Sequence, residues 1–82
     1  MTQAEITPIL VEYVVSAIPN AVEINNLEHA PLREILDSIS MIRFMAFIEE
    51  RFDLIIASAD VTPEQFSNLF SVSQLISRKL RS

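Results

Sequence analysis

The most regular helical pattern of the chain lies in the run Leu36-Asp37-Ser38-Ile39-Ser40-Met41-Ile42-Arg43-Phe44-Met45-Ala46-Phe47-Ile48-Glu49-Glu50-Arg51-Phe52-Asp53. Asp37 stands where a helix N-cap is expected, and apolar residues follow it at spacings of three and four. The predicted core face of this helix comprises Met41, Phe44, Met45, Ile48 and Phe52. The run therefore predicts a helix from Ser38 to about Phe52.

The same helix carries a second, narrower apolar face. This face consists of Ile39, Ile42 and Ala46 and is flanked by Arg43, Glu49 and Glu50. Ser38 lies at its edge. A helix with two apolar faces is expected to bury one of them in the core and to offer the other to a partner.

A second helical pattern runs from Ile6 to Ile18 and leaves its own start open. Thr2 and Glu5 have the spacing of a capping box, but Pro8 would then lie inside the helix and remove a hydrogen bond. With Thr7 as the cap, Pro8 occupies the first helical position, which is chemically cleaner. The helix is expected to end near Ile18, because a proline follows.

Residues 19–36 show weak periodicity and contain two prolines, so they predict a long connection. The apolar residues expected to anchor it to the core are Val22, Ile24, Leu27, Leu32 and Ile35. Two more helix starts follow, at Thr62-Pro63-Glu64-Gln65 and at Ser71-Val72-Ser73-Gln74. Both read as capping boxes, the first opening a short helix and the second the last helix.

These elements predict one all-α domain over residues 1–82, a four-helix bundle with three longer helices, one short helix and a long first loop. Half of the residues are apolar, which favours a folded globule. No apolar run approaches the roughly 18 residues of a membrane span, and the first residues show no signal-peptide pattern. A cytoplasmic protein is therefore expected.

Charge and composition exclude several classes of function. The net charge of −5 argues against nucleic-acid binding and favours partners with basic surfaces. The chain has no cysteine, no glycine and one histidine, His29, so it lacks a metal-ligand cluster, a phosphate-cradling loop and a catalytic triad. No catalytic or metal-binding residue is predicted, and His29 is expected to be a loop or surface histidine.

Ser38 has the position that a covalently attached anion would need. A phosphodiester on a serine at a helix N-terminus faces unpaired backbone N–H groups and the positive end of the helix dipole. The run from Asp37 to Asp53, the segment Thr62-Pro63-Glu64-x-Phe66 and the order of the elements together resemble the acyl and peptidyl carrier proteins. The resemblance extends over all 82 residues.

The resemblance implies that Ser38 bears a 4′-phosphopantetheine arm taken from coenzyme A, and that Asp37 helps the phosphopantetheinyl transferase and its metal ion recognise the serine. The thiol of the arm would hold an acyl or aminoacyl group as a thioester. The chain itself would be no enzyme. Its expected partners are that transferase, an acyl- or amino-acid-activating ligase, and a downstream acyltransferase, synthase or condensing enzyme. The surface expected to bind them comprises Ile39, Ile42, Arg43, Ala46, Glu49 and Glu50.

Leu36-Asp37-Ser38 and Thr62-Pro63-Glu64-Gln65-Phe66 look more like stand-alone D-alanyl or peptidyl carriers than like the housekeeping fatty-acid carrier, which favours a specialised biosynthetic pathway. One departure is that carriers usually have a glycine two to four residues before the serine, where this chain has Glu34-Ile35-Leu36. Arg43 is either a solvated side chain or a residue that tunes the partner surface. The alternative function is an unmodified four-helix protein–protein interaction module, in which Ser38 only caps the helix.

Overall fold

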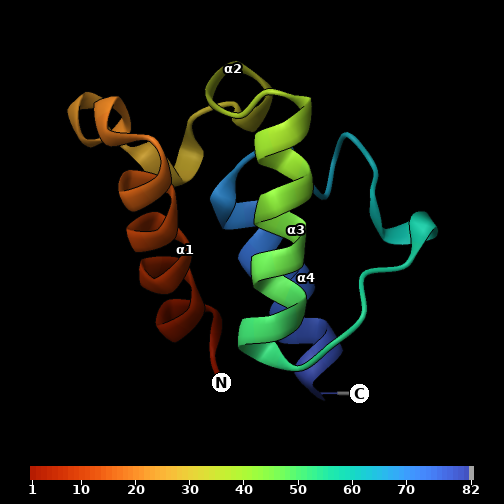
Figure 1. The fold of residues 1–82 in the computed structure, drawn as a ribbon. Coiled ribbons are helices and arrows are strands. Elements are labelled where there is room, and N and C mark those ends of the chain that lie inside the picture. Colours follow the sequence, from red (N-terminus) through yellow and green to blue (C-terminus); the bar gives the residue numbers. More distant parts are fainter. Residues whose placement is uncertain (82) are drawn as a thin grey trace.

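Four α-helices joined by long loops form the fold in the computed structural model, which describes residues 1–81 (Figure 1). The helices are α1 (Gln3–Ala17), α2 (Leu32–Ile35), α3 (Ser38–Phe52) and α4 (Leu69–Arg81). Three short 3₁₀ turns lie at Pro19–Glu23, Leu27–His29 and Ser58–Asp60. The predicted all-α bundle of three longer helices and one short helix is confirmed, although the short helix lies before α3 and not after it.

The three longer helices surround one core. Helix α1 packs against α4, while α3 lies in front of α4 in Figure 1. The start of α1 and the end of α4 lie at one end of the molecule, and α2 lies at the other (Figure 1). No helix within residues 1–81 is long and apolar enough to cross a membrane.

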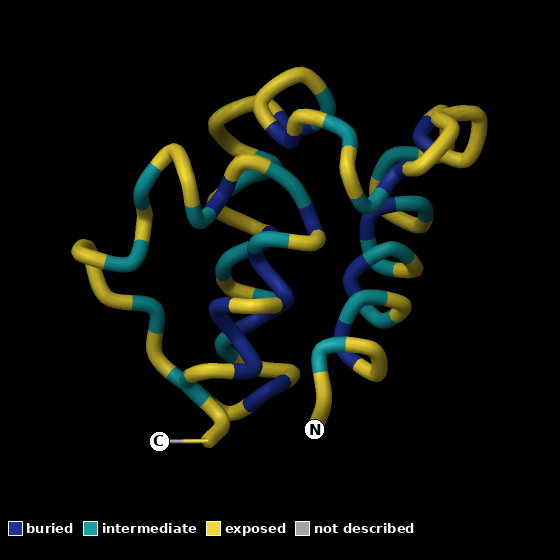
Figure 2. The backbone as a smooth tube through the Cα atoms, turned by 180° about the vertical axis from the view of Figure 1, so that it is seen from behind, coloured by how far each residue is buried: buried dark blue, intermediate teal, exposed yellow. Residues whose placement is uncertain are grey.

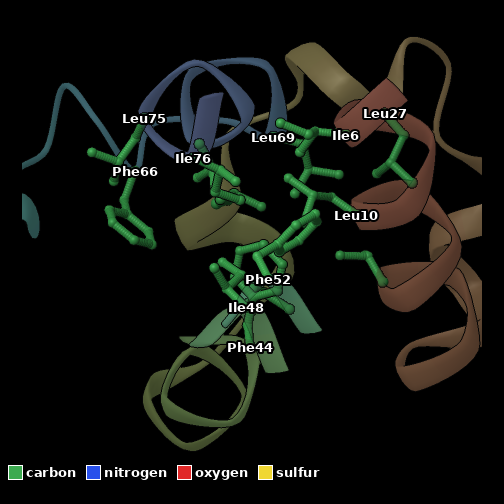
Figure 3. Close-up of a cluster of buried hydrophobic side chains, with 14 of the residues drawn as sticks. Ile6, Leu10, Leu27, Phe44, Ile48, Phe52, Phe66, Leu69, Leu75 and Ile76 are labelled. Carbon is green, nitrogen blue, oxygen red and sulfur yellow. The ribbon is translucent and has the colours of Figure 1, made fainter. Parts of the chain in front are cut away.

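The core is built from one face of each long helix (Figure 3). The buried side chains of these helices are Ile6, Leu10 and Val14 of α1, Phe44, Ile48 and Phe52 of α3, and Leu69, Val72, Leu75 and Ile76 of α4. The spacing of four in α1 and α3 is the period that keeps side chains on one face of a helix. The predicted core face of α3 is confirmed for its three largest members, while Met41 and Met45 are half-buried.

Helix α1 begins at Gln3, so the start at Thr7, preferred from the sequence, is wrong. The Glu5 carboxylate accepts a hydrogen bond from the Thr2 N–H at 2.9 Å, as the alternative start predicts. This earlier start puts Ile6 on the core face, where it is fully buried. Burial of a side chain of this size contributes roughly 1.5–3 kcal/mol, which largely offsets the roughly 3 kcal/mol cost of Pro8 inside a helix.

The α3 helix has the predicted bounds, and its ends show how a chain without glycine makes caps. Asp37 Oδ1 accepts a hydrogen bond from the Ser40 N–H at 2.7 Å, which confirms the predicted N-cap. Asp53 ends the helix in the left-handed region at φ 52°, and Asn26 is the other described residue with positive φ. Asn and Asp are the residues other than glycine that tolerate this region best, so they replace it here.

The connection between α1 and α3 is anchored by fewer side chains than predicted. Leu27 and Leu32 are buried as expected, but Val22 is 68% exposed and Ile24 is also exposed. The 3₁₀ turn at Pro19–Glu23 explains the difference, because its tighter period turns Ala21 inward in place of its neighbours. Ile35 is half-buried in α2, a one-turn helix that the weak periodicity of this segment did not predict.

The predicted short helix after Thr62 forms only a single turn. The Thr62 hydroxyl accepts from the Gln65 N–H at 3.1 Å, as in a capping box. The Gln65 side chain, however, bonds the Asp60 carbonyl and the Arg78 guanidinium and does not return to the Thr62 N–H. The backbone does not continue this turn as a helix, and the next helix begins at Leu69.

Helix α4 also starts earlier than predicted. Asn68 Oδ1 accepts from the Ser71 N–H at 2.7 Å, so Asn68 caps the helix and Ser71 lies inside it. The earlier start places Leu69 on the core face, where it is fully buried. Burial of Leu69, immediately after the cap, fixes where this helix begins. The capping pattern at Ser71 does not.

Candidate functional site

Ser38 is the first residue of α3 and its side chain is exposed. Its hydroxyl makes no hydrogen bond to any other residue of the described chain, so both its proton and its lone pairs are available to a reagent from solvent. The first N–H groups of α3 face the same end of the helix and have no partner in the preceding turn except the Asp37 cap. The site therefore presents a free hydroxyl at the positive end of a helix dipole.

The Asp37 carboxylate is held ionised by its neighbours. Hydrogen bonds from the N–H and the hydroxyl of Ser40 lower its pKa below the ordinary value of 3.8, and the Ile39 N–H and the charge of Arg43 act in the same direction. The carboxylate is fully exposed, so it combines two roles: it caps α3, and it offers its remaining lone pairs to a cation or a donor from outside.

We expect Asp37→Asn to leave the thermal midpoint near pH 7 almost unchanged, because asparagine caps helices as well as aspartate does. The native carboxylate has a lowered folded pKa, so its contribution to stability is present above 3.8 and is lost as the pH falls through the folded pKa. The parent should therefore lose more stability than the variant as the pH falls below about 4. Thermal melts across this range measure the difference.

The matched control is Asp53→Asn, at the other end of the same helix. Asp53 adopts the left-handed conformation that asparagine also tolerates, and its carboxylate accepts no hydrogen bond within the described residues. Its replacement should leave the acid sensitivity of the parent intact. An equal gain in acid resistance from both variants would contradict the role given to the Asp37 cap.

Beside Ser38, α3 exposes large apolar side chains. Ile39 is 64% exposed and Ile42 is 66% exposed, and Ala46 one turn further along is exposed as well. We call Ile39, Ile42 and Ala46 the isoleucine face. The chain buries the opposite side of the same helix, so this exposure is not a consequence of poor packing. Figure 2 shows the alternation of buried and exposed residues along the helices from behind.

The charged residues predicted around the isoleucine face have different surroundings. Arg43 and Glu50 are exposed, as a surface open to partners requires. Glu49 is half-buried, and its Oε2 accepts a hydrogen bond from the Ile56 N–H at 2.8 Å. This contact gives Glu49 a structural function, since it fixes the loop that follows α3.

Phe47 packs against α1. Its ring stacks on Tyr13 at 4.2 Å between centroids, and Tyr13 also stacks on Phe44 at 5.7 Å. A groove of about 570 Å³ runs over this pair, lined by Tyr13, Arg43, Ala46, Phe47, Glu50 and Arg51. The isoleucine face thus continues through Ala46 onto a surface shared with α1. Sequence reasoning missed Tyr13, because only the fold brings it to this face.

The segment before Ser38 needs no glycine. The Leu36 N–H donates to the Leu32 carbonyl at 2.8 Å, which closes the single turn of α2. Leu36 itself is extended, with φ −109° and ψ 126°, and no residue from Glu34 to Asp37 has a positive φ. The side chains that replace the usual glycine therefore cause no backbone strain here.

Comparisons with known proteins add no family to these observations. No protein-family model matches the chain, and no curated protein matches it. The resemblance to carrier proteins therefore stays a prediction that rests on the residues from Asp37 to Asp53 and on the Thr62–Phe66 segment, because the predicted order of the elements differs in the position of the short helix. Within residues 1–81, no three acidic or histidine side chains gather as they would around a metal ion.

Proposed function

We propose that this chain is an acyl or aminoacyl carrier whose cargo is held as a thioester on a 4′-phosphopantetheine arm at Ser38. The observation that carries the proposal is the exposed Ser38 hydroxyl, free of hydrogen bonds within the described chain, at the first residue of α3. Ionised Asp37 directly precedes it. Asp37 alone caps the helix, so the Ser38 hydroxyl is not needed for the cap and is available for attachment.

In the proposed modification, the Ser38 oxygen forms a bond to the phosphorus of coenzyme A that bears the pantetheine. The bond from that phosphorus to the bridging oxygen of the diphosphate breaks, and adenosine 3′,5′-bisphosphate leaves. The hydroxyl proton passes to a base of the transferase. The resulting phosphodiester carries one negative charge, which the N–H groups and the dipole at the start of α3 stabilise.

The isoleucine face supplies the surface on which partner enzymes would dock. Ile39 and Ile42 lie within about one turn of Ser38 on the same helix, so an enzyme that contacts them also reaches the arm. Arg43 and Glu50 border this face and would favour some partners over others by charge. The proposed partners are the transferase, an activating ligase for an acyl group or amino acid, and a downstream acyltransferase, synthase or condensing enzyme.

The experiment is intact mass spectrometry after incubation with coenzyme A and a broad-specificity phosphopantetheinyl transferase. We expect a gain of one phosphopantetheine per chain, and no gain when either reagent is left out. A well-folded chain that gains no mass with several transferases of different specificity would overturn the proposal.

The second candidate is an unmodified four-helix interaction module, favoured by the same exposed isoleucines. It would bind a protein through the isoleucine face and leave Ser38 as a surface hydroxyl. A partner that binds the unmodified chain with unchanged affinity after Ser38→Ala, together with no gain of mass, would support this candidate over the carrier.

A further inference from the structure

A cavity of about 550 Å³ lies away from the isoleucine face, between the segment that contains α2 and the start of α4. Its volume is in the range typical of small-molecule sites. Pro31 and Arg33 line one side, and Pro63, Phe66 and Asn68 line the other. The sequence did not predict it, because its two sides are about 30 residues apart in the chain.

Two contacts hold the sides of this cavity together. The Leu32 N–H at the start of α2 donates to the Ser67 carbonyl at 2.9 Å. The His29 ring packs against the Phe70 ring at 5.0 Å between centroids. One contact is a backbone hydrogen bond and the other is between rings, so the cavity belongs to the packed fold and not to a chance approach of two loops.

The side chains that line the cavity offer hydrogen-bond donors and no acidic group. The Arg33 guanidinium makes no ion pair or hydrogen bond within the described residues, and it cannot lose its charge. Asn68 uses its Oδ1 to cap α4, which leaves its NH₂ group without a partner in residues 1–81. His29 also lines the cavity. A set of donors beside a fixed positive charge is complementary to an anion with several acceptor oxygens.

Most of the remaining lining is apolar. Pro31, Pro63 and Phe66 line the cavity together with Ser67, whose hydroxyl donates to the Glu64 carbonyl. Phe66 is almost fully buried, so its position is fixed by the core. An inorganic anion would leave these walls in contact with water, whereas an organic acid would cover them and place its carboxylate at Arg33.

We propose that this cavity binds the carboxylate of a small organic acid with a short apolar body, with Arg33 as the principal ligand. Two sources share this chemistry: a free acid, or a cargo on the Ser38 arm that carries a second, free carboxylate. The second source rests on the proposed carrier function. Arg33 lies five residues before Ser38, at the start of the segment that leads into α3.

The first arm of the test uses the unmodified chain and two probes of nearly equal shape, hexanoate and neutral hexanamide. In two-dimensional amide NMR, hexanoate should shift the signals of Arg33, Phe66 and Asn68 in a saturable way, and hexanamide should not. Arg33→Gln should raise the Kd for hexanoate about tenfold or more, because a charge-assisted hydrogen bond is lost.

Arg81→Gln is the matched control, since Arg81 is an exposed arginine on α4 outside both the cavity and the isoleucine face. It should leave the Kd for hexanoate unchanged. Both variants replace exposed side chains, so their amide spectra also report whether the fold is intact. Three outcomes would overturn the proposal: equal shifts with hexanamide, an equal loss of affinity for hexanoate in both variants, or no saturable shift at the three amides.

The second arm identifies the source of the acid. The arm on Ser38 is loaded with either an adipoyl or a hexanoyl group, of which only the first has a free carboxylate. Shifts at the cavity with adipoyl alone, abolished by Arg33→Gln, would assign the site to the cargo; shifts with free hexanoate but with neither loaded group would assign it to a free acid. If mass spectrometry shows that Ser38 cannot be loaded, this result would count against the carrier function alone. The hexanoate experiment uses the unmodified chain and does not need phosphopantetheine on Ser38.

Discussion

Phe44→Asp is expected to abolish the cooperative thermal unfolding of this chain, whereas Ile42→Asp, two positions away on the same helix, is expected to preserve it. Phe44 is fully buried between α1 and the rest of the core and stacks on Tyr13. Ile42 is 66% exposed. The two substitutions introduce the same charge into the same helix. Their comparison therefore shows the effect of placing that charge on the buried face of α3 rather than on its exposed face.

The magnitudes separate the two variants clearly. Loss of a buried phenylalanine side chain costs about 3–5 kcal/mol, and an unpaired carboxylate in the core adds several more. At roughly 0.05–0.15 kcal/mol per residue, a chain of 82 residues has a total stability of about 4–12 kcal/mol. Phe44→Asp therefore removes most or all of the stability. Ile42→Asp should cost no more than about 1 kcal/mol, a shift in Tm of about 4–8 °C at most.

Circular dichroism melts of both variants measure this prediction. The Phe44→Asp protein should lack a cooperative transition and have reduced helical signal at 25 °C, while Ile42→Asp should resemble the parent. Similar melting curves for the two variants would show that the faces of α3 are assigned wrongly, and with them the surface proposed for partners.

The parts of the fold that sequence reasoning predicted correctly are those in which one local signal dominates. Helix α3 has a capping aspartate, a clear period and no proline, so its bounds, its core face and its exposed isoleucine face all follow from neighbouring residues. The spacing assigned Phe44, Ile48 and Phe52 to the core face, so the isoleucines on the other side of the helix were expected to be exposed. The position of Ser38 depends on this helix alone.

The errors arose where two local signals compete and a distant contact decides between them. At α1, the cost of Pro8 inside the helix favoured the later start, but burial of Ile6 against the core favoured the earlier one. At α4, Ser71 has the pattern of a cap, yet Asn68 caps the helix and Leu69 enters the core. Sequence spacing places Ile6 on an apolar face but does not show which start is favoured at either helix, because that depends on how the helices pack.

The cavity at Arg33 and the Tyr13–Phe47 stack were not predictable for a different reason. Each joins residues that are about 30 positions apart, and neither has a motif that would signal the pairing. The charge pattern gave no help, because Arg43 and Arg51 are also cations outside the basic end of the chain and nothing sets Arg33 apart from them.

Ser38→Ala is expected to abolish loading with phosphopantetheine completely, while Ser40→Ala is expected to load like the parent. The two serines are two residues apart in the first turn of α3 and differ in what they bond. The N–H and hydroxyl of Ser40 both bond the Asp37 carboxylate, whereas the Ser38 hydroxyl has no partner among the described residues. If the serines served only the cap, Ser40 would be the more important of the two.

Stability separates attachment from capping in the same pair of variants. Ser38→Ala removes no hydrogen bond and keeps the Asp37 cap, so its Tm should stay within about 4 °C of the parent. Ser40→Ala removes one hydrogen bond to Asp37 and should be the less stable variant. Loading that survives Ser38→Ala, or a loss of stability in Ser38→Ala larger than that in Ser40→Ala, would show that Ser38 serves the helix and not an attached group. Complete loss of loading at unchanged stability would leave the free hydroxyl of Ser38 with no function except attachment.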